Sequence, residues 1–118
     1  MAKLEHEFRG NFWEFLTLLE NSIMRDSMSA HLEDASDRTM GDAMCAIRVF
    51  ERYSWLGGNR VSLNITLLGK DDRLFLSAIA SGGSQAMFFK INTIGENAFL
   101  DSVRRVVRNY SSQSGRGF

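Results

Sequence analysis

The chain of 118 residues has no proline and a single cysteine. Because a proline would remove a backbone donor from a strand ladder, its absence suits long, continuous antiparallel strands. One cysteine excludes a disulfide within the chain. Cys45 lies in an alternating apolar pattern, so we expect a buried, reduced thiol, as in a cytoplasmic protein.

The sequence also lacks an excess of charge of either sign and a long apolar run. Fourteen basic and fourteen acidic residues give a formal net charge of zero, so no overall field attracts nucleic acid or an anionic membrane. No stretch approaches the ~20 apolar residues of a membrane helix, and the N-terminus does not resemble a secretory signal. We expect one soluble, cytoplasmic domain over residues 1–110 and a flexible, serine- and glycine-rich tail over 111–118.

Alternation of apolar and polar residues is the main pattern of the first eighty residues. It predicts half-buried strands, and glycine-containing loops at 55–59 and 69–72 predict hairpins between them. A further short strand is predicted at Ser29–Glu33, followed by a polar turn from Asp34 to Gly41. The clearer strands are 3–9, 43–53, 61–68 and 74–80.

Two segments have helical spacing. Asn11, with Glu14 three residues later, predicts a capped helix that runs to about Arg25. A second helix is predicted from about Glu96 to Tyr110, with acidic residues near its start and arginines near its end, as the helix dipole favours. The predicted apolar stripe of the first helix is Phe12, Phe15, Leu16, Leu19 and Ile23; that of the second is Phe99, Val103, Val106, Val107 and Tyr110.

The predicted element order is β-α-β-β-β-β-α. Strands must bury one face, and two amphipathic helices are available to cover it. We therefore predict a two-layer α+β domain in which a curved antiparallel sheet is covered by two helices. This order resembles the TATA-binding-protein-like and helix-grip-like arrangements, a likeness of fold that carries no function.

Two segments also resemble a family of small bacterial proteins of unknown function. The first is Glu51–Trp55 with Gly57–Leu63, and the second is Ala80–Lys90. The resemblance extends over nearly the whole chain short of the tail. It implies a single domain, and it supplies no activity, cofactor or catalytic residue.

The junction between the last strand and the last helix is the first candidate for a ligand site. Its paired glycines could form an anion-binding nest, although a turn is the more common use of such a pair. The bulky residues that follow could line an apolar pocket or close the core. The candidate ligand-binding residues are Gly82, Gly83, Ser84, Gln85, Met87, Phe88, Lys90 and Asn92.

Other chemistry is less favoured by the sequence. His6 and His31 lie in predicted strands whose acidic neighbours alternate outward, so neither a catalytic nor a metal site is predicted, and no cofactor is expected. A basic, aromatic sheet surface for nucleic acid is conceivable, but cross-strand charge pairs explain the same residues. Those residues are Arg48, Arg52, Arg60, Arg73, Tyr53 and Trp55.

The sequence holds more large apolar residues than one core face needs, and such a surplus often marks a contact surface. We predict a non-enzymatic binding module that self-associates, most simply as a homodimer. The alternative is a carrier of a small apolar ligand, with its pocket between the sheet and the C-terminal helix. The candidate interface residues are Trp13, Leu18, Trp55 and Leu56, with Met44 and Phe50 contributing to the surplus.

Overall fold

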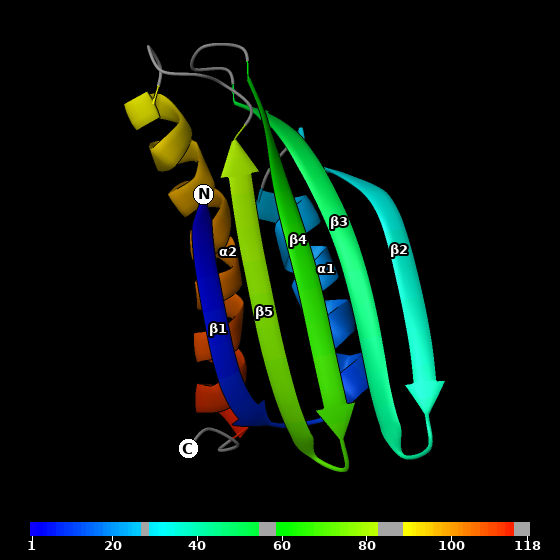
Figure 1. Ribbon diagram of the computed structural model, residues 1–118. Coiled ribbons are helices and arrows are strands. Elements are labelled where there is room, and N and C mark those ends of the chain that lie inside the picture. The colour runs from blue at the N-terminus through cyan, green and yellow to red at the C-terminus, as the bar shows by residue number, and fades with distance from the viewer. Residues whose placement is uncertain (27–28, 55–58, 83–88, 115–118) are drawn as a thin grey trace.

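The computed structural model describes residues 1–26, 29–54, 59–82 and 89–114, and for 54, 59, 89–98 and 112–114 it describes the backbone alone. It contains five strands and two helices within these ranges, in the predicted order (Figure 1). The elements are β1 (Ala2–Arg9), α1 (Phe12–Asp26), β2 (His31–Met40), β3 (Ala43–Ser54), β4 (Asn59–Lys70), β5 (Arg73–Gly82) and α2 (Phe89–Ser114).

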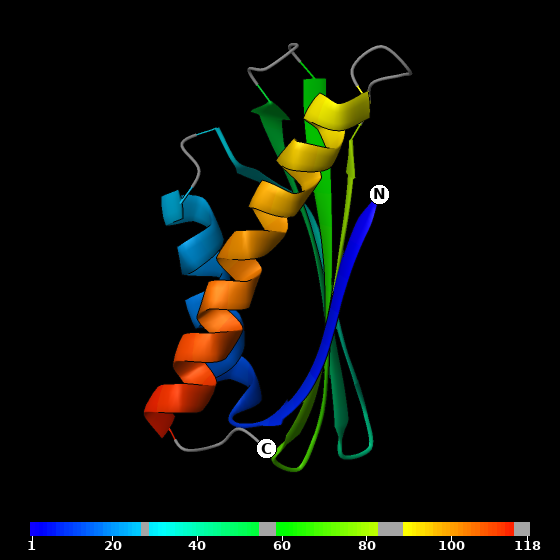
Figure 2. The same cartoon turned by 90° about the vertical axis from the view of Figure 1, so that its left-hand side faces the viewer.

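All five strands form one antiparallel sheet in the order β1-β5-β4-β3-β2. Strands β2 to β5 follow one another as a meander, and the last strand, β5, also pairs with the first strand, β1. Both helices lie on the same side of this sheet, as the two perpendicular views show (Figures 1 and 2). No described element covers the opposite face. The protein is therefore a two-layer α+β structure with one covered and one uncovered sheet face.

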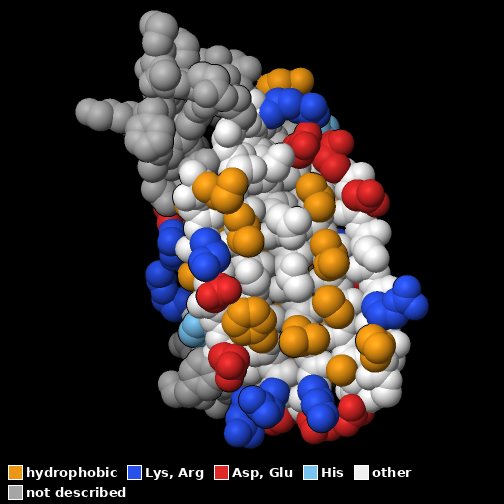
Figure 3. All heavy atoms as spheres, in the orientation of Figure 1, with side chains coloured by type: hydrophobic (Ala, Val, Ile, Leu, Met, Phe, Trp, Pro, Cys, Tyr) orange, Lys and Arg blue, Asp and Glu red, His pale blue; other side chains and the backbone are white. Residues whose placement is uncertain are grey.

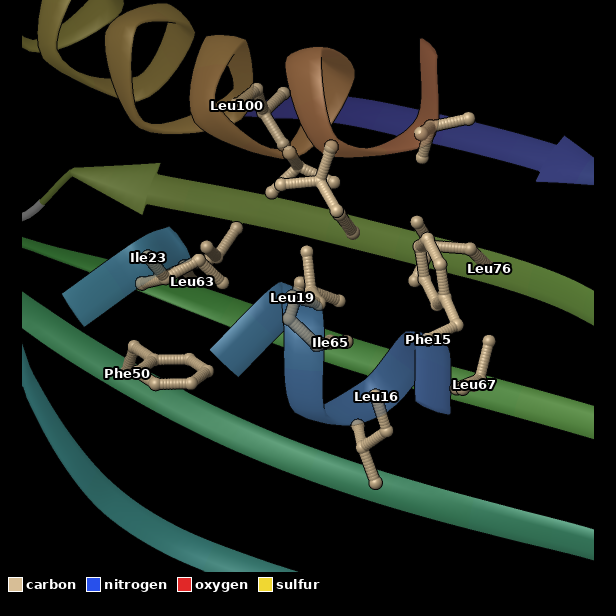
Figure 4. Close-up of a cluster of buried hydrophobic side chains, with 14 of the residues drawn as sticks. Phe15, Leu16, Leu19, Ile23, Phe50, Leu63, Ile65, Leu67, Leu76 and Leu100 are labelled. Carbon is tan, nitrogen blue, oxygen red and sulfur yellow. The ribbon is translucent and has the colours of Figure 1, made fainter. Parts of the chain in front are cut away.

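The core lies between the sheet and the two helices (Figure 4). Strand alternation sends every second residue of β4 and β5 toward the helices, and the predicted stripe of α1 is buried in full. Each fully buried Val, Leu, Ile or Phe side chain stabilises the fold by roughly 1.5–3 kcal/mol. The strand contribution to the core includes Phe8, Ala46, Phe50, Val61, Leu63, Ile65, Leu67, Leu74, Leu76, Ala78 and Ala80.

Two predicted turns are longer than the turns in the structure. Residues 34–40, predicted as a polar turn, continue β2 and pair with β3, and the turn is confined to Gly41 and Asp42. All ten residues of β2 are exposed because neither helix covers this edge of the sheet, so the strand carries no apolar alternation to reveal it. Gly69, predicted in the next turn, also lies inside a strand.

The limits of α2 differ from the prediction as well. The helix begins at Phe89 rather than near Glu96, and it has no acidic residue in its first turn and no basic residue in its last. Its first turns hold β-branched residues and Gly95, which are poor helix formers and conceal the start. At the other end, residues 111–114, assigned to the tail from the sequence, continue α2.

The predicted cap of α1 is confirmed, with an addition from α2. Asn11 Oδ1 accepts a hydrogen bond from the Glu14 N–H at 2.9 Å. The Tyr110 hydroxyl accepts one from the Asn11 N–H at 3.0 Å and donates one to the Glu14 carboxylate at 2.9 Å. A Cβ at Gly10 would lie 2.5 Å from this hydroxyl, so only glycine fits beside it. Tyr110 thus joins the end of α2 to the start of α1.

We predict that Tyr110→Phe lowers the free energy of unfolding by about 1–2 kcal/mol, because it removes two hydrogen bonds at a half-buried helix end. The matched control is Tyr53→Phe, at an exposed residue on the uncovered face, which should change it by less than about 0.5 kcal/mol. Urea denaturation measures both. Equal effects of the two substitutions would contradict the role given to Tyr110.

Arg48 of β3 is the one arginine that ranks as buried among the described residues, with 7% of its surface exposed. It donates from Nε to Glu20 of α1 at 2.5 Å and from Nη1 to Asp37 of β2 at 2.6 Å. Hydrogen bonding to Asp37 raises the pKa of Arg48, against the opposing effect of burial and with further help from Glu20. Three elements meet at this guanidinium: the edge strand, its neighbour and the first helix.

We predict that Arg48→Met lowers the free energy of unfolding by about 2 kcal/mol, since it leaves two carboxylates without their shared cation. Arg104→Met is the control, because among the described residues that arginine pairs with Asp101 alone, in an exposed i,i+3 contact, and its loss should cost at most about 0.5 kcal/mol. Both are measured by urea denaturation. A loss for Arg48→Met no larger than that of the control would show that the network contributes nothing.

Candidate functional site

The uncovered face of the sheet carries an apolar band across its three central strands. The same alternation that fills the core turns the intervening residues outward. Leu68 is 46% exposed there, and hydrophobic side chains gather in the middle of this face (Figure 3). We define the apolar band as Cys45, Ile47 and Val49 of β3, Leu68 of β4, and Phe75 and Ile79 of β5.

Strand register arranges the band in rungs that run across the sheet. One rung passes through Cys45, Leu68 and Phe75, which are direct cross-strand partners. A second rung, four residues further along each strand, contains Val49 and Ile79 on either side of Asn64. Partners of this kind have Cβ atoms about 4.5–5.5 Å apart, so each rung presents a nearly continuous row of side chains.

Charged residues surround the band on the two edge strands and at one end. Strand β1 presents Lys3, Glu5, Glu7 and Arg9 outward, and the outward residues of β2 include Asp34 and Arg38. Lys70 and Arg73 are cross-strand partners on the rung nearest the turns, at one end of the band. An apolar centre with a polar and charged rim is the usual composition of a protein contact surface.

The position of Cys45 corrects the sequence reading. Its thiol was expected in the core, but the side chain lies on the uncovered face and is only half-buried. The helix-facing position next to it belongs to Ala46, which is fully buried. Alternation alone identifies two faces of a strand and does not say which of them the helices cover.

The predicted ligand-binding residues are mostly outside the described structure. Gly82 ends β5, and residues 83–88 lie beyond the described ranges. Lys90 and Asn92, expected in a connector, belong to the first turns of α2, where the backbone alone is described. The described space between the sheet and α2 is filled by core side chains (Figure 4). The ligand site at this junction stays a prediction.

The predicted interface residues are partly accessible. Trp13 and Leu18 are exposed on α1, whereas residues 55 and 56 lie outside the described ranges. Phe50 is in the core, whereas Met44 is partly buried against the core and lines the hollow beside Trp13. The buried stripe of α1 does not include Trp13 or Leu18.

Trp13 and Leu18 each adjoin a shallow hollow. Leu18 lines one of about 250 Å³ between α1 and α2, where Asp26 and Arg105 form an ion pair at 2.9 Å. The hydrogen bond from Arg105 lowers the pKa of Asp26. Trp13 packs edge-on against Phe12 at the rim of a second hollow, of about 490 Å³.

The two histidines are not brought together. His6 lies on β1, half-buried and stacked on Phe8, while His31 is exposed on β2 at the other edge of the sheet. Within the described ranges, no three His, Cys, Asp or Glu side chains come close enough together to hold a metal ion. The geometry therefore offers no acid–base pair built from both histidines.

The predicted basic, aromatic surface is divided between the two faces of the sheet. Arg48 and Arg52 point toward the helices, and Arg52 lies 4.4 Å from the centre of the Phe99 ring, where burial lowers its pKa. Arg60, on the uncovered face, pairs with Glu51 at 2.9 Å and lies over Tyr53. These arginines do not form one continuous surface for nucleic acid.

Comparison with known protein families matches residues 1–111 to DUF6054, a family of unknown function. The chain belongs to this family. The match covers both resembling segments and ends where the tail was predicted to begin, so the resemblance to a family of unknown function is confirmed. A search of curated proteins finds no match. No helix in the described part of this DUF6054 protein is long and apolar enough to span a membrane.

The apolar band is the feature that sequence reasoning missed. A signal for it was present, because β3 and β5 carry apolar residues at both odd and even positions. A strand of an ordinary two-layer protein needs only one apolar face. Apolar residues on the second face therefore indicate a further contact, once the tertiary structure shows that both helices occupy the first.

We predict that a maleimide labels Cys45 in the dilute native protein, because its thiol is accessible on the uncovered face. The control is Cys45→Ala/Ala46→Cys, which moves the thiol by one residue into the core and should react at least about tenfold more slowly. Mass spectrometry follows the labelling. Equal protection of both thiols in folded protein would contradict the assignment of the two faces.

Proposed function

We propose that this DUF6054 protein is a non-enzymatic binding module that self-associates through the apolar band. The observation that carries the proposal is the set of partly exposed apolar side chains on a sheet face that no described element covers. An apolar centre with a polar rim is characteristic of association sites. We also propose that it acts in the cytoplasm, in keeping with its single, unpaired cysteine.

The size of the face supports a second copy of the chain as the occupant. With strands about 4.8 Å apart and residues about 3.3 Å apart along each strand, the five-stranded face measures roughly 700 Å². Two such faces would bury roughly 1,400 Å², which is within the usual range for a specific protein interface. Sheets that pack face to face lie about 10 Å apart with their strands nearly aligned.

The exposed residues of α1 give weaker support for an interface. Trp13 and Leu18 belong to separate hollows. The hollow at Leu18 is lined mainly by polar and charged groups, and the one at Trp13 by polar and apolar groups in equal measure. Single exposed hydrophobic residues are normal on soluble proteins. We therefore place the self-association surface on the sheet and retain Leu18 as an internal comparison.

We predict that Leu68→Lys weakens the dimer at least tenfold, since it places a charge at the centre of the apolar band. Leu18→Lys is the matched control: the residue type is the same and the exposure is similar, 44% against 46%, but the side chain lies on α1. Sedimentation velocity from about 1 µM to about 200 µM gives the dissociation constants.

Two results would count against this function. A wild-type chain that stays monomeric throughout the concentration range would exclude self-association. An equal loss of dimer in the two variants would exclude the apolar band as its site. Because both leucines are already exposed, each variant should fold, and circular dichroism checks this independently.

A further inference from the structure

On two rungs of the uncovered face, the residues at the two edges carry opposite charges. On the rung through Leu68, Arg38 stands at the β2 edge and Glu7 at the β1 edge. On the rung through Asn64 the signs are reversed, with Asp34 on β2 and Lys3 on β1. All four residues are exposed. The face therefore has four charged corners, and the two corners of each diagonal carry the same sign.

A pattern of this kind is complementary to itself. Strand β4 is the middle strand of the five, so a two-fold axis parallel to β4, between two facing sheets, places β1 of one copy over β2 of the other. Arg38 then faces Glu7 of the second copy, and Lys3 faces Asp34 of the second copy. Symmetry repeats both contacts, which gives four attractive pairs around the apolar band.

We infer that two copies of the chain pack uncovered face to uncovered face about a two-fold axis parallel to β4. The inference rests on the proposed function and adds the orientation of the partner. Sheets in such packings cross at about 30°, and the long side chains at the corners span the resulting offset. Opposite charges placed across an interface fix its register more than they add to its affinity.

The same axis also matches the apolar residues. It places Leu68 over Leu68 of the second copy. It also places Phe75 over the second copy's Cys45, because rotation about β4 exchanges the β3 and β5 ends of the rung. An in-plane axis perpendicular to the strands would instead place Leu68 over Asn64. It would also place Glu5 over Glu5, since the rung containing Glu5 would lie on the axis. Charge does not separate the two axes, because the axis parallel to β4 places Lys70 over Lys70 of the second copy and both axes pair the four corners with opposite charges. The axis parallel to β4 is favoured by the apolar contact of Leu68 with Leu68 at the centre of the face.

Charge exchange tests the orientation. Arg38→Glu alone should raise the dissociation constant of the dimer about tenfold at low salt, because two attractive pairs become repulsive. Adding Glu7→Arg to the same chain restores opposite charges across the interface and should bring the constant back to within about threefold of wild type. Sedimentation velocity measures all variants, and thermal melting checks that each remains folded.

The comparison variant is Arg38→Glu/Asp34→Arg. This variant exchanges the two charges within β2 and keeps the net charge of that strand. Under the proposed axis it leaves Glu at position 38 facing Glu7 of the second copy, so it should bind no better than Arg38→Glu. Rescue by Asp34→Arg instead of Glu7→Arg would overturn the inference, because Arg38 would then meet Asp34, as in edge-to-edge pairing of β2 or about the perpendicular axis.

The outcome for the wild-type chain separates this inference from the proposed function. A monomeric wild-type chain would overturn both. A wild-type dimer that loses stability with Leu68→Lys but shows no rescue by Glu7→Arg would support the function and overturn the orientation. A wild-type dimer with rescue by Glu7→Arg alone would support both.

Discussion

The apolar contact between two helices and one face of the sheet determines the rest of the structure. Each helix has a single apolar stripe, and both stripes are used on the same side of the strands. The buried residues of β4 and β5 complete this contact and leave their alternate positions outward. A five-stranded sheet covered on one side must therefore present its second face to solvent or to another molecule, and the apolar band lies on that face.

The two helices do not cover the sheet edge formed by β2, and a polar contact holds that edge instead. All of β2 is exposed, so hydrophobic burial holds this strand little. Arg48 instead joins it to α1 through Asp37 and Glu20. A buried arginine is stabilised only when its donors are paired, which both carboxylates accomplish. This network holds the strand that supplies Asp34 and Arg38 to the rim, and so connects the stability of the fold to the shape of the candidate surface.

The sequence predicts those elements whose burial differs between two faces. Strands β1, β3, β4 and β5, the stripe of α1 and the Asn11 cap follow from alternation, helical spacing and capping chemistry. Only the first residues of β2 were predicted, because the strand is exposed on both faces, and the start of α2 was missed because its first turns lack a cap signal. The apolar band could not be located from local patterns, since the covered face of β3 is decided by helices distant in sequence. Arg48 looked like a surface charge for the same reason.

The composition of the uncovered face suits reversible association. Asn64, Thr66 and Ser77 interrupt the band, so the exposed apolar surface is divided and the single chain can stay in solution. Burying an interrupted band releases less free energy than burying a continuous one, while the loss of translational and rotational freedom is unchanged. The alternating corner charges add orientation without requiring a larger apolar area. The population of the proposed dimer would then respond to concentration and ionic strength.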